Sequence, residues 1–461
     1  MSEWRPIQIG AKSYQPRSGT QSIERLVNLY PEASAPGAKT PVTLYGTPGL
    51  LAWTTVGDGP IRGIHYARGY FWVVSGTRLY AVNAGTKAIT NIGVVAGVGP
   101  VRMINDATYV VVCAQTFSYA ATLTSIVVLP EEDLVGAAYQ DGYGLYVQRN
   151  TQFMWLSGLD DLTTIGATAF TSADVKSDNV VAVISDQREV WVFKQQTTEV
   201  YYNSGNSTFA FERVGGGFIE RGCASPGSVA AAETFVFWLG DDLKVYRAAG
   251  YNPEAISTPD IERLISNAIS PETSEAFTYA QAGHTFYVLT CADLTLCYDL
   301  TTNRWHERKS FGLSRWRAHG HAVSGQLQIV GDYSTNELYE IDLDTYTDSG
   351  DLIERIAIDP PLSADPRPLF IHELHLDFEA GVGLTSGQGV APEVLLSWSE
   401  DDGRTWSSDR AGSLGALGVY RKRARFTRLG RSYNRSHRWR ISDPVKIAIL
   451  GAAARVDLGA A

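Results

Sequence analysis

The feature that most constrains the fold of this chain is a loose repeat that begins near residue 61. Each copy has a polar turn, an aromatic or aliphatic strand, a Gly or Asp, and a second strand that ends in Tyr. One copy spans residues 61–82, and successive copies start about 36–50 residues apart, the length of a four-stranded propeller blade. Stacking such blades in a ring buries faces that one small sheet leaves open. The repeat predicts a β-propeller of six or seven blades, with two β-sandwiches as the alternative.

The composition favours an all-β chain. Tyr 23, Phe 16 and Trp 11 are distributed among 44 glycines, and this mixture is typical of short strands joined by tight turns. One short helix is predicted, because residues 257–260 supply a cap and a first-turn proline, and Ile261, Leu264 and Ile265 form one apolar face.

Pro-rich segments divide the chain into four parts. Residues 1–60 contain too many prolines for a long helix and predict an extended N-terminal arm. The propeller is expected over residues 61–345, followed by a stiff, Pro-rich linker over 346–370. Residues 371–461 are interpreted as a C-terminal β-sandwich, because their apolar residues alternate as in half-buried strands. In the first of these strands, Phe370, Leu374, Leu376 and Phe378 are expected on one face.

Nothing in the sequence marks a cofactor, metal or catalytic site. The spacing of the four cysteines fits neither a zinc site nor a disulfide scaffold, so small buried side chains are expected at Cys113, Cys223, Cys291 and Cys297. His319 and His321 lack a third ligand at a usual distance. No run of about 18 apolar residues and no apolar signal core are present. These observations predict a protein that is not an enzyme and that stays in the cytoplasm unless a larger assembly carries it out.

One motif matches the Asp-box pattern S-x-D-x-G-x-T-W in full. The pattern predicts a hairpin turn in which the Asp bonds turn amides, the Gly has positive φ and the Trp packs beneath. Asp-boxes occur in sialidases, so a glycan-binding or sialidase-like propeller protein is the alternative function. A sialidase also needs an arginine cluster, a Tyr nucleophile and an acid, and no local pattern marks them. The matching residues are Ser399, Asp401, Gly403, Thr405 and Trp406.

The net charge of −10 is unevenly distributed. Residues 420–446 contain ten basic side chains and one acid, so the rest of the chain is strongly acidic. The segment reads as a β-hairpin with an arginine face, which suits an oligomer or partner interface. A solvated charged face and contact with the DNA backbone are the alternatives. The arginines of this predicted face are Arg421, Arg423 and Arg425 on one strand and Arg438 and Arg440 on the return strand.

Two parts of the sequence carry a family resemblance. The opening QSIERLVNLYPE (residues 21–32) with LYGTPGL (44–50) resembles that of packaged-DNA stabilisation proteins of short-tailed phages, also called tail nozzle or tail hub proteins. The end of the chain, with residues 380–383, the Asp-box, 429–432 and 441–445, is similar to the same family. With the blades between them, the resemblance spans nearly the whole chain.

The resemblance implies a structural protein of the virion tail, assembled in the host cytoplasm. It implies a hexameric ring below the portal and adaptor, in contact with tail needle, fibre or spike proteins. Such a ring closes the channel, retains packaged double-stranded DNA and passes it during ejection, without sequence-specific binding, catalysis or a membrane anchor.

In a six-fold ring, the acidic run from Glu340 to Asp359 is expected to face the DNA path. Acidic walls avoid the affinity that neutralised phosphates and released counterions give. An outer, solvent-facing position and a calcium loop are the alternatives, although the loop lacks the Gly and Glu of an EF-hand. The candidate lining residues are Asp342, Asp344, Asp348 and Asp351.

Overall fold

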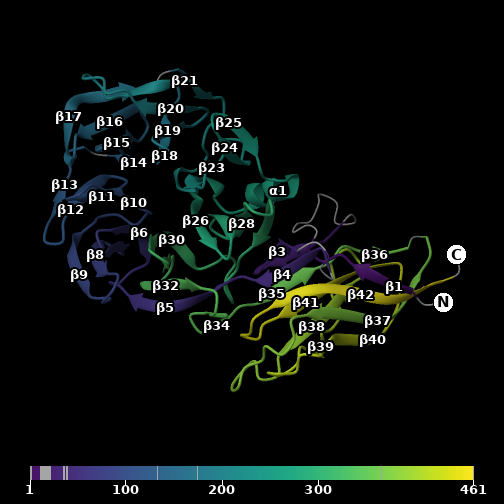
Figure 1. The fold of residues 1–461 in the computed structure, drawn as a ribbon. Helices are drawn as coiled ribbons and strands as arrows, with labels where there is room; N and C mark the ends of the chain where they lie inside the picture. The colour runs from purple at the N-terminus through teal and green to yellow at the C-terminus, as the bar shows by residue number, and fades with distance from the viewer. Residues whose placement is uncertain are drawn as a thin grey trace.

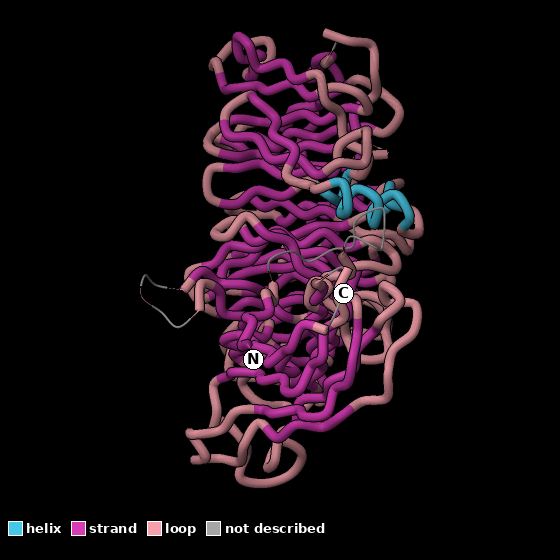
Figure 2. The backbone as a smooth tube through the Cα atoms, turned by 90° about the vertical axis from the view of Figure 1, so that its right-hand side faces the viewer, coloured by secondary structure: helices cyan, strands magenta, loops and turns pink. Residues whose placement is uncertain are grey.

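The computed structural model describes residues 3–10, 22–34, 37, 40–131, 133–173, 175–364 and 366–459, which form a β-propeller joined to a β-sandwich (Figure 1). The predicted all-β fold is therefore confirmed. Gln21 of the family motif and Asp365 of the expected linker lie outside the described residues. The predicted helix is α1 (Pro259–Asn267), with Ile261 and Ile265 buried, and it lies on one side of the stacked blades (Figure 2). In the part of the chain that the structure describes, no helix has the length and apolarity to cross a membrane.

The propeller has seven blades, each a four-stranded antiparallel sheet. Blade 1 comprises β6 (Ile61–Ala67), β7 (Tyr70–Ser75), β8 (Arg78–Asn83) and β9 (Ile89–Val94). Blade 2 comprises β10 (Arg102–Asn105), β11 (Val110–Ala114), β12 (Phe117–Ala121) and β13 (Ile126–Val128). Blade 3 comprises β14 (Leu134–Gln140), β15 (Tyr143–Gln148), β16 (Phe153–Gly158) and β17 (Asp161–Ser172). Blade 4 comprises β18 (Val180–Asp186), β19 (Glu189–Lys194), β20 (Thr198–Asn203) and β21 (Phe211–Ile219). Blade 5 comprises β22 (Ala230–Ala232), β23 (Phe235–Leu239), β24 (Val245–Ala249) and β25 (Asn252–Ala255). Blade 6 comprises β26 (Glu275–Gln281), β27 (His284–Thr290), β28 (Thr295–Asp299) and β29 (Arg304–Glu307). Blade 7 comprises β30 (Ala318–Ser324), β31 (Leu327–Asp332), β32 (Glu337–Asp342) and β5 (Gly49–Thr55).

Separate hydrophobic clusters fill all seven gaps between blades. β11, for example, is buried along its whole length, because blade 1 covers one of its faces and blade 3 the other. This two-sided burial explains why the inner strands are continuously apolar rather than alternating.

The ring is closed by a strand from near the start of the chain. β5 pairs antiparallel with β32 and forms the outer strand of blade 7, although residues 1–60 were expected to lie outside the propeller. The boundary expected at residue 60 is wrong for this strand, because its partner is almost 300 residues away and no local pattern reveals it. Gly49 is required where β5 begins, since a Cβ there would lie 2.4 Å from the Thr345 carbonyl oxygen.

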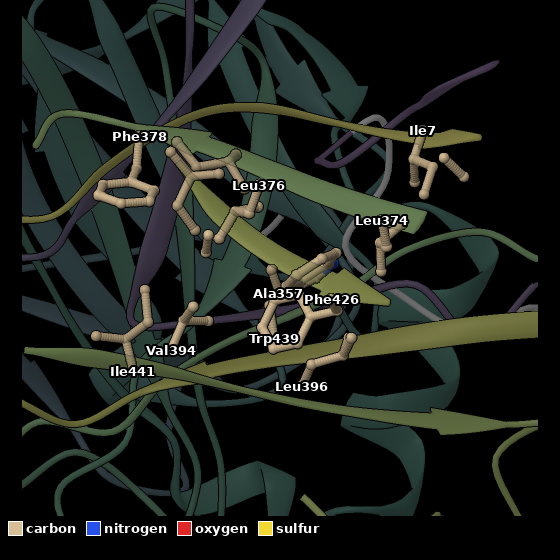
Figure 3. Close-up of a cluster of buried hydrophobic side chains, with 14 of the residues drawn as sticks. Ile7, Ala357, Leu374, Leu376, Phe378, Val394, Leu396, Phe426, Trp439 and Ile441 are labelled. Atoms are coloured by element: carbon tan, nitrogen blue, oxygen red, sulfur yellow. The ribbon is translucent and has the colours of Figure 1, made fainter. Parts of the chain in front are cut away.

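The sandwich consists of two sheets whose inner faces share one core. From that core, Leu374, Leu376 and Phe426 of one sheet face Val394 and Trp439 of the other (Figure 3). The first sheet contains β3 (Leu29–Ala33), β4 (Val42–Gly46), β42 (Ala448–Leu458), β37 (Leu369–Phe378) and β40 (Ala424–Ser432), with β1 (Glu3–Ile7) also on β42. The second contains β2 (Arg25–Val27), β35 (Arg355–Ile358), β41 (Asn434–Ile441), β38 (Glu393–Ser399) and β39 (Arg410–Ser413), with β36 (Leu362–Ser363) also on β41.

Strands from the expected arm and linker are therefore part of both folded units. β1 to β4 and β35 belong to the sandwich, and β33 (Thr347–Asp348) and β34 (Asp351–Leu352) extend blade 7. The interpretation of 346–370 as a stiff, extended linker is wrong for these strands, since each one pairs in a sheet.

The two units are joined by a continuous ten-stranded sheet. β2 pairs parallel to β29 of blade 6 on one side and antiparallel to β35 on the other. Arg25 donates two hydrogen bonds to the Glu307 carboxylate, at 2.8 and 2.6 Å. Next to them, the buried Asn28 has φ of 54° and donates to the carbonyls of Lys309 and Glu354, at 2.8 and 2.9 Å. This joint thus ties the propeller and the sandwich together through an N-terminal segment.

Candidate interaction surfaces

The predicted arginine hairpin does not exist. β40 pairs with β37 in the first sheet, whereas β41 pairs with β35 and β38 in the second. Phe426 and Trp439 both point into the common core, so Arg425 and Arg440 emerge on opposite outer faces of the sandwich. The prediction that these arginines share one face of a hairpin is therefore wrong, because the chain crosses from one sheet to the other around residue 433.

Neighbouring acids neutralise much of the basic segment. Arg423 pairs with Asp377, and Arg425 donates from Nε to Glu373 at 2.6 Å. Arg440 pairs with Asp409, and Arg438 instead donates to Ser397 at 3.0 Å and stacks over the Trp406 ring. Exposed pairs of this kind contribute about 0–1 kcal/mol each. Acids thus pair with five of the ten basic side chains of this segment, and the other five have no ion pair to a described residue.

Arg421 and Lys422 are the basic side chains that stay exposed at one end of the sandwich, without an ion pair to any described residue. They lie in a surface that we call the sandwich tip, formed by the loops 380–392 and 414–423. The two loops are held together by the Gly418 amide, which donates to the Gly381 carbonyl at 3.2 Å. Tyr420 is 75% exposed at this tip. The tip was missed in the sequence because it combines two loops that lack any periodic pattern.

The acidic run does not form a row of equivalent carboxylates. Asp342 closes a turn by accepting a hydrogen bond from the Thr345 hydroxyl at 2.6 Å, and Asp344 is exposed in that turn. Asp351 pairs with Arg317 at 2.7 Å. Asp348 is only 2% exposed and accepts a hydrogen bond from Ser310 at 2.7 Å, and its burial raises the pKa of the carboxyl. Asp348 is therefore excluded as a channel-lining residue, whereas a lumen position for the other three stays a prediction.

The propeller's own channel is divided by an ion pair. Arg102 of blade 2 and Glu275 of blade 6 are not on neighbouring blades, yet their Nη2 and Oε2 atoms are 2.6 Å apart. Both residues line two cavities, one of about 180 Å³ that also includes His319 and His321, and one of about 320 Å³. A DNA duplex, whose major groove alone is about 12 Å wide, does not fit through such a channel.

The Asp-box forms the turn that its sequence predicts. Asp401 accepts hydrogen bonds from the Thr405 amide at 2.8 Å and the Thr405 hydroxyl at 2.6 Å. These hydrogen bonds to the ionised form lower the pKa of Asp401 to about 2. Ser399 accepts from the Gly403 amide at 2.8 Å, and Gly403 has φ of 82°. Trp406 packs beneath Arg438, so every residue of the motif has a structural partner in the sandwich.

Burial favours the neutral form of several cysteine and histidine side chains. Burial raises the pKa of Cys113 to about 12 and lowers the pKa of His321 to about 4. All four cysteines are buried and free, as the sequence predicted. Among the described residues, no three His, Cys, Asp or Glu side chains are grouped so that they would hold a metal ion.

Two family models match the chain in succession. The model described as "Bacteriophage P22 Gp10, beta-propeller" matches residues 6–346, and "Bacteriophage P22 Gp10, beta-sandwich" matches residues 354–457. No curated protein matches the sequence.

Solved structures with a similar shape have low sequence identity. The computationally designed Ika8 protein is 8% identical, with a TM-score of 0.41 over 64% of this chain and 100% of its own. The Neurospora crassa Pan2 WD40 domain is 11% identical, with a TM-score of 0.40 over 64% of this chain and 94% of its own. BamB from Moraxella catarrhalis is 9% identical, with a TM-score of 0.41 over 73% of this chain and 97% of its own. Likenesses at this level carry no argument about function.

Proposed function

The chain belongs to the bacteriophage P22 Gp10 family, and from this premise we propose that it is a structural protein of a phage tail nozzle. Six copies form a ring below the portal and adaptor, close the DNA channel, retain the packaged genome and pass it during ejection. The observation that carries this proposal is the consecutive match of both family models to the propeller and to the sandwich.

The structure of the propeller supports a conduit between copies rather than through one copy. The Arg102–Glu275 pair crosses the channel of the propeller itself, so DNA has to pass through a lumen that several subunits enclose. Retention is then steric, by closure of that lumen, and an acidic wall leaves the DNA free to move. Asp342, Asp344 and Asp351 are the residues we propose to face it.

The glycan-binding or sialidase-like alternative gains no support from the Asp-box. The chain has a single copy of the motif, and that copy lies in the sandwich rather than in a propeller blade. All of its side chains are used in the turn and its packing. We propose that the protein is not an enzyme.

Weak binding to DNA is the first expected result. The isolated protein should show no submicromolar, salt-sensitive binding of duplex DNA in filter-binding assays at low salt, because its net charge of −10 repels polyanions. Tight binding that falls steeply with salt would mean that charge holds the DNA, and the steric closure would have to be abandoned.

Assembly should depend on the unpaired basic residues of the sandwich tip. Exchange of Arg421 and Lys422 for Glu should weaken ring formation, and more strongly at low salt than at high salt, because exposed charges are screened. Light scattering coupled to size exclusion, with and without a portal–adaptor complex, measures the assembly. Arg213→Glu, at an exposed position of β21 on the propeller without an ion pair to a described residue, is the matched control. Arg423 and Arg425 are poorer test sites, since their exchange also breaks the pairs with Asp377 and Glu373. If the double variant assembles as the wild type does, Arg421 and Lys422 are not part of the interface.

A further inference from the structure

One stretch of the propeller is almost free of charge. Residues 88–130 contain only two charged side chains, Arg102 and Asp106. Arg102 lies in the channel and Asp106 is buried, so neither places a charge on the outer surface. The charge-free stretch comprises the outermost strand of blade 1, β9, and all four strands of blade 2, of which β13 is the outermost.

The outer edge of these blades exposes aliphatic side chains. β9 and β13 are the outermost strands of blades 1 and 2, and each is paired on one side only among the described strands. Val94, Val127 and Val128 are each more than half exposed, and Val98 is 92% exposed. We call the surface formed by these four valines and Phe117 the blade rim. Natural sheet edges are commonly protected by charged residues, and contiguous exposed apolar surface marks an interface.

The sandwich tip is a second exposed apolar surface on the same chain. Leu417, Val419 and Tyr420 protrude from it beside Arg421 and Lys422. It lies in the sandwich, on a different part of the molecule from the outer edge of blades 1 and 2, where the labels β9 and β13 mark the rim (Figure 1).

The two surfaces are complementary in charge as well as in hydrophobicity. Glu131 and Asp133 follow β13, and the Asp133 amide donates to the Thr116 carbonyl at 3.1 Å, next to Phe117 of the rim. Asp133 is exposed and Glu131 is half-buried, with one carboxylate oxygen inside the protein, and neither forms an ion pair with a described residue. Acids therefore flank the rim, whereas unpaired basic residues flank the tip.

We propose that the blade rim of one copy docks onto the sandwich tip of the next copy. This inference rests on the proposed ring and names the surfaces that build it. Contact between two different surfaces of identical subunits is heterologous and closes into a ring when the rotation permits. A second copy of the chain covers both apolar surfaces at once, whereas a foreign partner on one of them would leave the other exposed.

The test uses two double variants of the full chain. The rim variant carries Val98→Asp and Val128→Asp, and the tip variant carries Leu417→Asp and Val419→Asp. All four positions are exposed, so the fold should persist, and circular dichroism checks it. By light scattering, the wild type should give the mass of a ring, and each variant alone should give the monomer mass of 50.3 kDa. An equimolar mixture of the two variants should give twice that mass, because one intact rim still meets one intact tip and neither remaining surface can continue the chain.

The outcomes separate this inference from the proposed function. If the wild type forms rings and both variants form them equally well, the rim–tip contact is wrong and the nozzle proposal stands. If each variant is monomeric and the mixture stays monomeric, the rim and the tip do not meet each other. If the wild type is monomeric at every concentration, alone and with a portal–adaptor complex, both proposals fail. Ile269→Asp, at an apolar position that is 60% exposed outside both surfaces, is the matched control and should assemble as the wild type.

Discussion

Replacement of Lys194 by Met should destabilise the propeller by about 3–5 kcal/mol, the range found when one partner of a buried ion pair is removed. The Lys194 side chain is fully buried in blade 4, with Nζ 2.8 Å from the Glu199 carboxylate and 3.0 Å from that of Asp178. It also donates to the carbonyls of Ala173 and Lys176, at 2.9 and 2.8 Å. Met fills a similar volume but leaves two buried carboxylates without a counter-charge. The free energy of unfolding from urea titrations measures the loss.

Two further variants test whether the loss of stability in Lys194→Met is caused by unpaired buried charge. Lys176→Met, at an exposed position of the adjoining loop, removes one positive charge without burial and should change stability little. Glu199→Gln in the Lys194→Met background removes one of the uncompensated charges and should recover part of the loss. A Lys194→Met protein as stable as the Lys176→Met control would contradict the electrostatic role assigned to this triad.

Replacement of Asn28 by Val should uncouple the propeller from the sandwich and cost more than about 3 kcal/mol. The Asn28 side chain donates to the carbonyls of Lys309 and Glu354 and accepts from the Lys309 amide, and each buried group left unpaired costs about 1–3 kcal/mol. A β-branched residue is also strained at the observed φ of 54°. Calorimetry should therefore resolve two unfolding transitions for this variant, whereas the wild type is expected to show one.

Asn28→Gly separates the two contributions at this position. Glycine tolerates the positive φ but lacks the side-chain hydrogen bonds, so this variant should lie between the wild type and Asn28→Val in stability. A single transition for Asn28→Val, at the wild-type temperature, would show that the pairing of β2 with its neighbours suffices to couple the two units.

The blades were predictable because each carries its own pattern. Residues 61–82, for example, already contain the first three strands of blade 1, and every later blade repeats that local arrangement. Pairing between distant segments leaves no such mark. The contact of Gly49 with Thr345, which fixes the start of β5, exists only in three dimensions. For that reason the arm and the linker were expected as separate segments, whereas their strands complete blade 7 and the sandwich.

Alternation predicted that Arg425, Arg438 and Arg440 face outward, but not which sheet carries each of them. Arg421 and Arg423, expected on the same strand as Arg425, precede β40, which begins at Ala424. Consecutive strands joined by a few residues are usually read as a hairpin, whereas in this sandwich β40 and β41 lie in opposite sheets. A shift of register between Ile371 and Glu373 similarly breaks the expected face of β37. Phe370 is therefore exposed, although Leu374 and Leu376 are buried as expected. Such bulges insert a residue without a dependable sequence signal.

The closing strand β5 has a consequence for how the protein is made. A ribosome releases residues 49–55 long before residues 337–342, their partners in blade 7, have been translated. β1 waits longer still, because it pairs with β42 at residues 452–456. The propeller cannot close until residue 342 has been translated, and a product that ends before β42 lacks a strand in the middle of the first sandwich sheet. Only a chain that has been translated through β42 can therefore complete both units.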